Sequence, residues 1–190
     1  MNAMHSEPGD ELLIAVDAAD NVLAYRTKRE LHAGAGVLHR AFSIFLFNAR
    51  GEVLVQQRSR LKPLWPGFWS NSCCSHPRRG ENDLDAARRR LTEELGVRSE
   101  PEFLYRFEYH AAFDALGSEH ELCSVYLARS AAPPRVDPDE VAAWKWMACA
   151  VLDRELAAQP ERFTPWLKLE WPRLRTEFAG RVADFAVPQR

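Results

Sequence analysis

The strongest constraint on the fold is a nearly continuous apolar run, AFSIFLF, at residues 41–47. A turn over residues 48–51 follows it, and a second strand-like segment, EVLVQQR, covers residues 52–58. Two such segments joined by a short turn predict a β-hairpin. The second strand ends at Arg58 and Lys62 follows shortly, so the hairpin delivers two cations to the segment that comes next.

That next segment, WPGFWSNSCCSHP at residues 65–77, is expected to hold the chemistry of the chain. It is too irregular for a long helix or a regular strand, which predicts a loop held in a defined shape. Cys74 and His76 place a potential nucleophile or proton carrier beside a potential metal ligand. Taken alone, the same pair also fits a buried free cysteine and a hydrogen-bonded histidine, so partner residues elsewhere in the chain must decide.

Strands and helices alternate along the rest of the chain. A helix capped by Asn82 or Asp83 is expected to run to about Leu95, with Gly96 as its stop. Residues 27–40 are expected to form a loop, because two glycines within them disfavour a regular helix. A long helical region, interrupted near Pro172, is expected at 164–185. The remaining elements are a helix at 151–158 and strands at 11–16, 22–26, 103–112, 120–129 and 142–147.

Size and charge bound the class of protein. With 190 residues and 21.7 kDa, the chain predicts a single domain at 11–190 after a disordered lead at 1–10. A formal charge of -2 and a pI near 6.3 argue against nucleic acid or an anionic membrane as partner. The four cysteines suggest no disulfide framework, and no signal segment is apparent. No apolar run approaches the roughly 20 residues of a membrane helix, so a protein of the reducing cytoplasm is expected.

Other residues able to take part in chemistry lie on both sides of the cysteine segment. His32 and His39 lie on the expected upstream loop, and each alone also fits a solvated or hydrogen-bonded histidine. Glu119 and Glu121 share one face of a strand if the strand reaches back that far. Two carboxylates on one face either hold a cation or remain exposed. Tyr109, on the preceding strand, is the residue best placed to lie near that pair.

Three cations and two further side chains complete the candidate set. Lys28, Arg58 and Lys62 either form a solvated surface or hold a doubly charged phosphate ester. Glu93 and Glu94 lie in the last turn of their helix, where the helix dipole disfavours an anion, so a carboxylate there either holds a cation or is simply solvated. Trp166, in the segment FTPWLKLEW, is by default a core residue.

Four motifs together resemble type I isopentenyl diphosphate isomerase: WSNSCCSHP, the downstream EHE at 119–121, the two upstream histidines and TPW at 164–166. The resemblance spans residues 13–171, and the motifs agree in order and spacing. It implies an α/β (α+β) variant of the Nudix fold, a single domain in which a mixed sheet is flanked by helices.

The ordinary Nudix signature separates an isomerase from a hydrolase. Laid over residues 75–97, it meets Ser75 in place of the opening glycine and Arg90 in place of a glutamate. Nudix hydrolases gather magnesium with several carboxylates on this helix, so a cation at residue 90 damages that site. Hydrolysis is therefore less favoured than isomerisation, and a Nudix pyrophosphohydrolase is kept as the alternative.

The resemblance implies two metal sites and a diphosphate site. Mg²⁺ is expected between Glu94 and the substrate diphosphate. The diphosphate is expected to bind Lys28, Arg58 and Lys62. A second divalent metal, Mn²⁺ or Zn²⁺, has as its implied ligands His32, His39, His76, Glu119 and Glu121.

The resemblance also implies the groups that move protons. Cys74 is one, and Glu121 with Tyr109 beside it is the other. Cys73 competes for the role of catalytic thiol, but Cys74 is favoured because it stands two residues before His76. Trp166 is expected to face developing positive charge in the substrate.

The implied reaction interconverts isopentenyl diphosphate and dimethylallyl diphosphate through a tertiary carbocation, in isoprenoid biosynthesis. It needs an acid, a base, an aromatic surface and an apolar lid against water. A binding module in which Cys74 and the histidines hold structural zinc stays open as a third possibility. The expected partners are the two diphosphates, without nucleic acid or membrane, and the expected state is a monomer.

Overall fold

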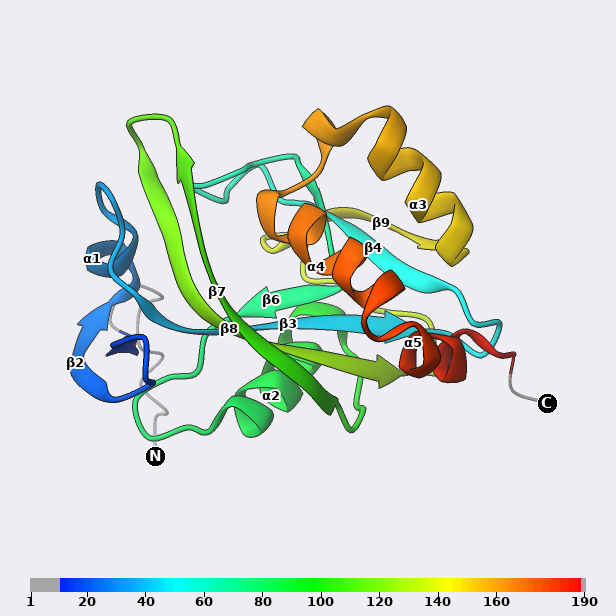
Figure 1. The fold of residues 1–190 in the computed structure, drawn as a ribbon, viewed down its shortest axis with the longest axis horizontal. Helices are drawn as coiled ribbons and strands as arrows, with labels where there is room; N and C mark the ends of the chain where they lie inside the picture. The colour runs from blue at the N-terminus through cyan, green and yellow to red at the C-terminus, as the bar shows by residue number, and fades with distance from the viewer. Residues whose placement is uncertain (1–10, 189–190) are drawn as a thin grey trace.

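A nine-stranded mixed sheet forms the frame of the protein, and helices cover both of its faces (Figure 1). The computed structural model describes residues 11–188, so the expected lead at 1–10 lies outside the described residues. Strand β3, His39–Phe47, is central and pairs in parallel with β8, Gly117–Arg129. The predicted α/β class, a mixed sheet flanked by helices, is confirmed.

Strand β3 is buried on both faces, which explains its nearly continuous apolar sequence. Phe42, Ile44 and Leu46 pack on one face with α2, Asp83–Leu95. Phe45 and Phe47 join the core on the other face, with α4, Pro165–Thr176, and α5, Ala179–Ala186. Burial of such side chains contributes about 25 cal/mol per Å² of apolar surface. Because helices occupy both faces, a site on this strand has to form at its end.

The predicted hairpin at residues 41–58 is wrong in its pairing. Strand β4, Val53–Arg58, meets β3 only at the pair Phe47 and Val53. Its main partners are β9, Val141–Met147, and the short β5, Trp69–Ser70. The edge of β3 that a hairpin partner would take is occupied by β6, Cys73–Ser75, and by β1, Leu12–Val16. The turn joins the two strands, but tertiary contacts decide their partners.

The segment at residues 65–77, predicted to be a loop, contains two short strands, β5 and β6. Strand β6 pairs antiparallel with β3, and Cys74 stands directly opposite Ser43. Strands of two or three residues show no periodicity in a sequence, so composition alone indicated a loop. The pairing holds Cys74 against the centre of the sheet.

Strands β7, Glu102–Phe113, and β8 form the long predicted hairpin, and both reach further than predicted. Because β8 begins at Gly117, Glu119 and Glu121 both lie within it and share one face. Tyr109 of β7 stands directly opposite Glu121.

The N-terminal strands are β1, Leu12–Val16, and β2, Val22–Thr27. The residues after β2 were expected to form a loop, but Lys28–His32 forms the short helix α1. A capping box starts this helix. The Thr27 N–H donates to Glu30 Oε2 at 2.9 Å, and the Glu30 N–H donates to Thr27 Oγ1 at 3.4 Å. The two glycines that argued against a helix lie beyond it, in residues 33–38.

The C-terminal helices cover one face of the sheet. Helix α3, Cys149–Ala158, and a 3-10 turn at Pro160–Arg162 precede α4 and α5. The predicted interruption near Pro172 is wrong, because α4 runs through it. Pro172 removes one backbone donor, but Trp171 and Leu174 on either side are buried and hold the helix in place. Within residues 11–188, no helix is long and apolar enough to cross a membrane.

Candidate active site

Five side chains predicted as metal ligands converge at one end of the sheet. One histidine ends α1, one begins β3, one follows β6, and both glutamates lie near the start of β8. One ligand atom from each residue lies within 4.8 Å of the others, and all five residues are buried: His32, His39, His76, Glu119 and Glu121. Segments far apart in the sequence therefore form one compact set of donors, which we call the donor cluster.

Backbone carbonyls orient two of the imidazole rings. His32 Nδ1 donates to the Lys28 carbonyl at 2.6 Å, and His39 Nδ1 donates to the Val37 carbonyl at 2.7 Å. In neutral rings this leaves the Nε2 lone pairs directed into the cluster. His32 Nε2 lies 2.7 Å from Glu119 Oε2. Two acceptors at that distance repel each other unless they share a proton or a metal ion.

Burial and close neighbours set the charge of the cluster. Burial and His32 lower the pKa of His39 to about 4, and burial and His39 lower the pKa of His76. Burial acts to raise the pKa of Glu119, but the positive charge of a protonated His32 outweighs it and lowers that pKa to about 2. A metal ion in the cluster would take the place of that charge and leave the ring neutral. Neutral imidazole and ionised carboxylate are the forms that bind metals.

The donor cluster fits a divalent metal. Nε2 of His32, Nε2 of His39 and Oε2 of Glu119 are buried and lack a hydrogen-bond partner among the described residues. A buried polar atom without a partner is costly, and a metal ion would satisfy all three. The mixture of nitrogen and oxygen donors is typical of Zn²⁺ or Mn²⁺ sites.

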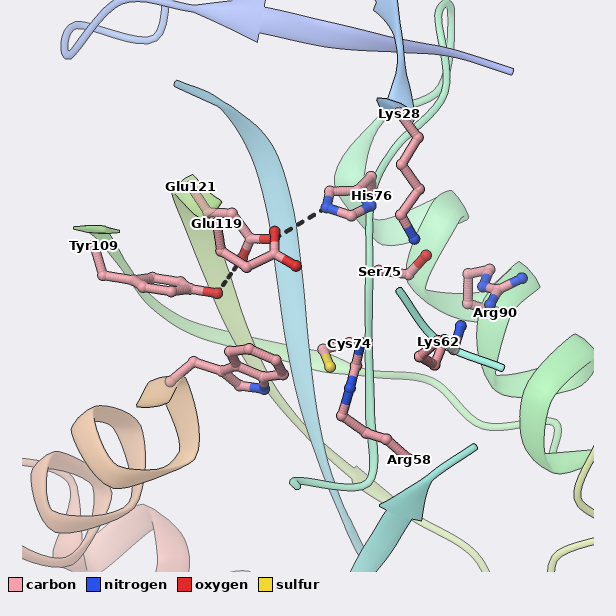
Figure 2. A pocket seen from close by; sticks show the side chains of 11 residues that line it. Lys28, Arg58, Lys62, Cys74, Ser75, His76, Arg90, Tyr109, Glu119 and Glu121 are labelled. Atoms are coloured by element: carbon pink, nitrogen blue, oxygen red, sulfur yellow. Dashed lines mark hydrogen bonds and ion pairs between the residues drawn. The ribbon is translucent and has the colours of Figure 1, made fainter. Parts of the chain in front are cut away.

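Glu121 connects the donor cluster to a cavity (Figure 2). Its Oε1 lies 3.0 Å from His76 Nε2, and the Tyr109 hydroxyl donates to its Oε2 at 2.7 Å. Burial and the charge of Glu119 raise the pKa of Glu121, and burial beside Glu121 raises the pKa of Tyr109. Without a cation nearby this carboxyl keeps its proton to higher pH, and a metal ion in the donor cluster would favour its ionised form, so the group is suited to exchange a proton with a ligand.

Cys74 lines the same cavity from β6. Its Sγ lies 4.0 Å from Ser70 Oγ. Burial raises the pKa of Cys74 to about 12, against the opposing charge of Arg58, so the group is a thiol at neutral pH. Strands β6 and β8 both pair with β3, so Cys74 and Glu121 reach the cavity from strands on either side of β3 (Figure 2).

Four cations line the cavity as well: Lys28, Arg58, Lys62 and Arg90. In the sequence, Arg90 stands out only as a departure from the hydrolase signature, and nothing there marks it as a residue of the cavity. Burial lowers the pKa of Lys28, and burial and Lys28 lower the pKa of Lys62 to about 8. An anion of two or more charges would favour the protonated lysines and bind all four groups.

Glu94 is buried but does not line the cavity. Arg90 Nε donates to Glu94 Oε1 at 2.9 Å, and Arg90 also lies 3.0 Å from Glu140 Oε1. Lys62 pairs with the same Glu140. The spacing of four residues between Arg90 and Glu94 on a helix is the sequence signal that indicates their pairing. The two carboxylates therefore compete with any anion for these cations.

Trp166 forms an aromatic wall of the cavity. Its Nε1 donates to Ser70 Oγ at 2.9 Å and to Asn71 Oδ1 at 3.0 Å. The Trp65 ring meets it edge-on at 5.3 Å, and the Arg58 guanidinium lies 5.2 Å from its ring centroid. The ring is thus held in place and already attracts a cation. Ser70 and Asn71 escaped prediction because no local pattern pairs them with Trp166.

The cavity has an enclosed part and an open part. The enclosed part has a volume of about 30 Å³, and Ser75 is also among its lining residues. A cleft of about 420 Å³ shares Lys28, Arg58 and Lys62 with it and includes Leu116 in its lining. Cys74 and Glu121 line only the smaller of the two parts.

Comparison with known proteins identifies the family. The NUDIX domain family matches residues 37–167. Isopentenyl-diphosphate Delta-isomerase 1 of Photorhabdus laumondii is 42% identical over 163 residues, covering 85% of this chain and 93% of that protein. The chain belongs to the isopentenyl-diphosphate Delta-isomerase family. A second family member, from Serratia proteamaculans, is 43% identical over 83% of this chain and 87% of its own length.

Solved structures agree on the fold of this family. The crystal structure of DR0079 from Deinococcus radiodurans superposes with a TM-score of 0.70 at 27% identity, covering 86% of this chain and 98% of that one. The family predicted from the cysteine, EHE and TPW motifs is confirmed, and the relatives' names favour an isomerase over the pyrophosphohydrolase alternative. The roles of individual residues stay predictions.

Proposed function

We propose that the chain is an intramolecular isomerase that interconverts isopentenyl diphosphate and dimethylallyl diphosphate in isoprenoid biosynthesis. One observation carries the proposal: Cys74 and the Glu121–Tyr109 pair reach one cavity from strands on either side of β3, and four cations line that cavity. Family membership supports the same reaction, since the relatives carry its name.

The reaction moves a double bond without changing the atoms of the substrate. A proton adds to the terminal alkene carbon of isopentenyl diphosphate, a tertiary carbocation forms, and a proton leaves the carbon on the diphosphate side. We assign these two transfers to Glu121 and Cys74, of which one donates its proton as the acid and the other, in its deprotonated form, accepts a proton as the base. After each turnover one group has gained a proton and the other has lost one, so a proton returns between them before the next.

The surroundings of these groups suit a carbocation. Trp166 offers an aromatic face, a contact worth about 2 kcal/mol when desolvated. The cavity is small, about 30 Å³, so a bound substrate would displace most of the water that could otherwise trap the cation. The diphosphate is anchored by Lys28, Arg58 and Lys62, and by Arg90 in addition.

Two metals complete the proposal. The donor cluster would hold Zn²⁺ or Mn²⁺. Glu94, once released from Arg90, would share Mg²⁺ with the diphosphate. A bound dication supplies a fixed positive charge that alters the proton affinity of the carboxylates around it.

The proposal includes a monomer in the cytoplasm that binds neither nucleic acid nor membrane. The formal charge of -2 supports the absence of polyanion partners. A reducing compartment is supported by the four cysteines, all of which are free: Cys73, Cys74, Cys123 and Cys149.

Isotope exchange tests the reaction directly. The protein is incubated with isopentenyl diphosphate, Mg²⁺ and Zn²⁺ in deuterated water. The expected product is dimethylallyl diphosphate that carries deuterium in the newly formed methyl group. Release of pyrophosphate with unlabelled starting material would contradict the isomerase and favour the hydrolase.

A further inference from the structure

The loop at residues 33–38 joins two of the proposed metal ligands, His32 and His39, and closes one side of the donor cluster. The Val37 N–H donates to the Leu31 carbonyl at 2.8 Å, which folds the loop back on α1. The Val37 carbonyl in turn accepts from His39 Nδ1 at 2.7 Å. The direction in which His39 Nε2 points therefore depends on the position of this loop.

The tip of the β7–β8 hairpin holds the loop by two successive carbonyls. The Ser118 hydroxyl donates to the Gly34 carbonyl at 2.8 Å, and His110 Nε2 donates to the Ala35 carbonyl at 2.7 Å. Ser118 is 2% exposed, whereas the His110 bond is open to solvent. The Ser118 bond is therefore the stronger of the two, because water competes with it less.

Two glycines allow the hairpin tip and the loop to touch through their backbones. A Cβ added at Gly117 would lie 2.4 Å from the His32 carbonyl oxygen. A Cβ added at Gly36, which has a φ of +73°, would lie 3.3 Å from Ser118. Neither position has room for a side chain without displacement of the loop. The contact is therefore specific to this arrangement of hairpin and loop.

We propose that Ser118, assisted by His110, is a positioning residue that pins the 33–38 loop so that His32 and His39 present Nε2 to a divalent cation. Neither Ser118 nor His110 is a ligand. The inference rests on the proposed function, since it assumes that the donor cluster binds a metal. Strand β8 would then have two tasks, because it supplies Glu119 and Glu121 as ligands and holds the loop between two others.

The size of the expected effect follows from known supporting residues of metal sites. Loss of a group that orients a ligand typically weakens metal binding by about 10- to 100-fold. Ser118 acts through the loop backbone rather than on a ligand directly, so we expect the lower end, about tenfold. The exposed His110 bond is expected to contribute less, about threefold.

The test measures Co²⁺ and Zn²⁺ affinity of the full chain by competition with a chelator, and records the Co²⁺ absorption spectrum. Ser118→Ala should bind about tenfold more weakly with an altered spectrum, and Ser118→Thr, which keeps the hydroxyl, should restore both. Ser124→Ala is the matched control. Ser124 is buried on the same strand, but its Oγ donates to Asp83 at 2.6 Å, so its loss should leave metal affinity unchanged.

The outcomes separate the positioning role of Ser118 and His110 from metal binding by the donor cluster itself. His110→Ala is an exposed change that should fold, and it carries the test if Ser118→Ala does not. Unchanged affinity and spectrum in the folded variants would overturn the inference and leave the metal site intact. An equal loss in Ser124→Ala would assign the effect to general stability and also overturn it. If the unaltered chain bound neither metal, the proposed function would fail first.

Discussion

The two ends of the cavity pose opposite electrostatic problems. At the donor cluster, three imidazoles and two carboxylates converge, and their unpartnered acceptor atoms require a positive ion. At the cation end, four positively charged side chains line the wall and require a negative one: Lys28, Arg58, Lys62 and Arg90. One cavity thus combines donors that suit a metal ion with charged groups that suit an anion.

The two ends are also held in different ways. The rings of His32 and His39 are fixed by backbone carbonyls at the ends of secondary structure. Lys62 and Arg90 are long side chains paired with carboxylates that an incoming anion has to displace. The donor end is therefore organised before anything binds, whereas an anion at the cation end would have to replace existing ion pairs.

Replacing Cys74 tests whether both ends of the cavity serve one reaction. It is expected to lower turnover more than any other substitution proposed below. Cys74→Ala should lower turnover by about 10²- to 10⁴-fold, the usual contribution of a positioned acid or base. Co²⁺ and pyrophosphate should still bind, because neither end is altered. Cys73→Ala removes the adjacent buried thiol and should keep most of the turnover. Loss of metal in Cys74→Ala would support a structural zinc site instead.

Metal removal asks whether the donor end matters to chemistry or to folding. Chelation should abolish turnover while the chain stays folded, because the core between β3 and the C-terminal helices contains no part of the donor cluster. Circular dichroism and turnover before and after chelation measure both effects, and added Zn²⁺ or Mn²⁺ should restore activity. Unfolding on chelation would contradict this prediction and show that the metal at the donor cluster is structural.

Arg90 tests the exchange of ion pairs at the cation end. Arg90→Gln should raise KM for isopentenyl diphosphate about tenfold with a smaller change in kcat, because one charged hydrogen bond to the ligand is lost. Arg88→Gln is the control, since Arg88 lies on the same helix, is exposed and pairs with Glu100. Equal KM values in the two variants would show that Arg90 only neutralises Glu94.

Glu170 is a buried carboxyl outside both ends of the cavity, and its pKa is set by burial and by hydrogen bonds from Ser43 and Cys123 rather than by a nearby charge. Burial raises its pKa from 4.5 to about 8, and its contacts are Cys123 and Ser43. The folded chain then binds this proton more tightly than the unfolded chain. The associated stability is complete below about pH 4.5 and is lost as pH rises through about 8.

Glu170→Gln removes this titration. Its melting temperature should exceed that of the parent by several degrees near pH 9. Near pH 4 the two proteins should melt together, because the carboxyl is then largely protonated in both the folded and the unfolded chain and matches the amide in shape. Calorimetry at both pH values provides the measurement, and an equal difference at both would show that the proton on Glu170 has no part in it.

Parts of the site were predictable because they depend on local geometry. Glu119 and Glu121 alternate along a strand, which places them on one face wherever the strand lies. The meeting of His32 and His39 with His76 depends on β6 and β1 sharing one edge of β3, which no local pattern encodes. Their joint role was expected only through the resemblance to a family.

By itself, the sequence determined the buried central strand, the capped helix α2 and the family, because apolar periodicity, caps and motifs are properties of neighbouring residues. The tertiary structure alone decided that β4 leaves β3 for β9, that Cys74 lies on a strand, and that Arg90 covers Glu94. These outcomes depend on contacts between distant segments. Their energies are set by which edges and charges remain free once the sheet has formed.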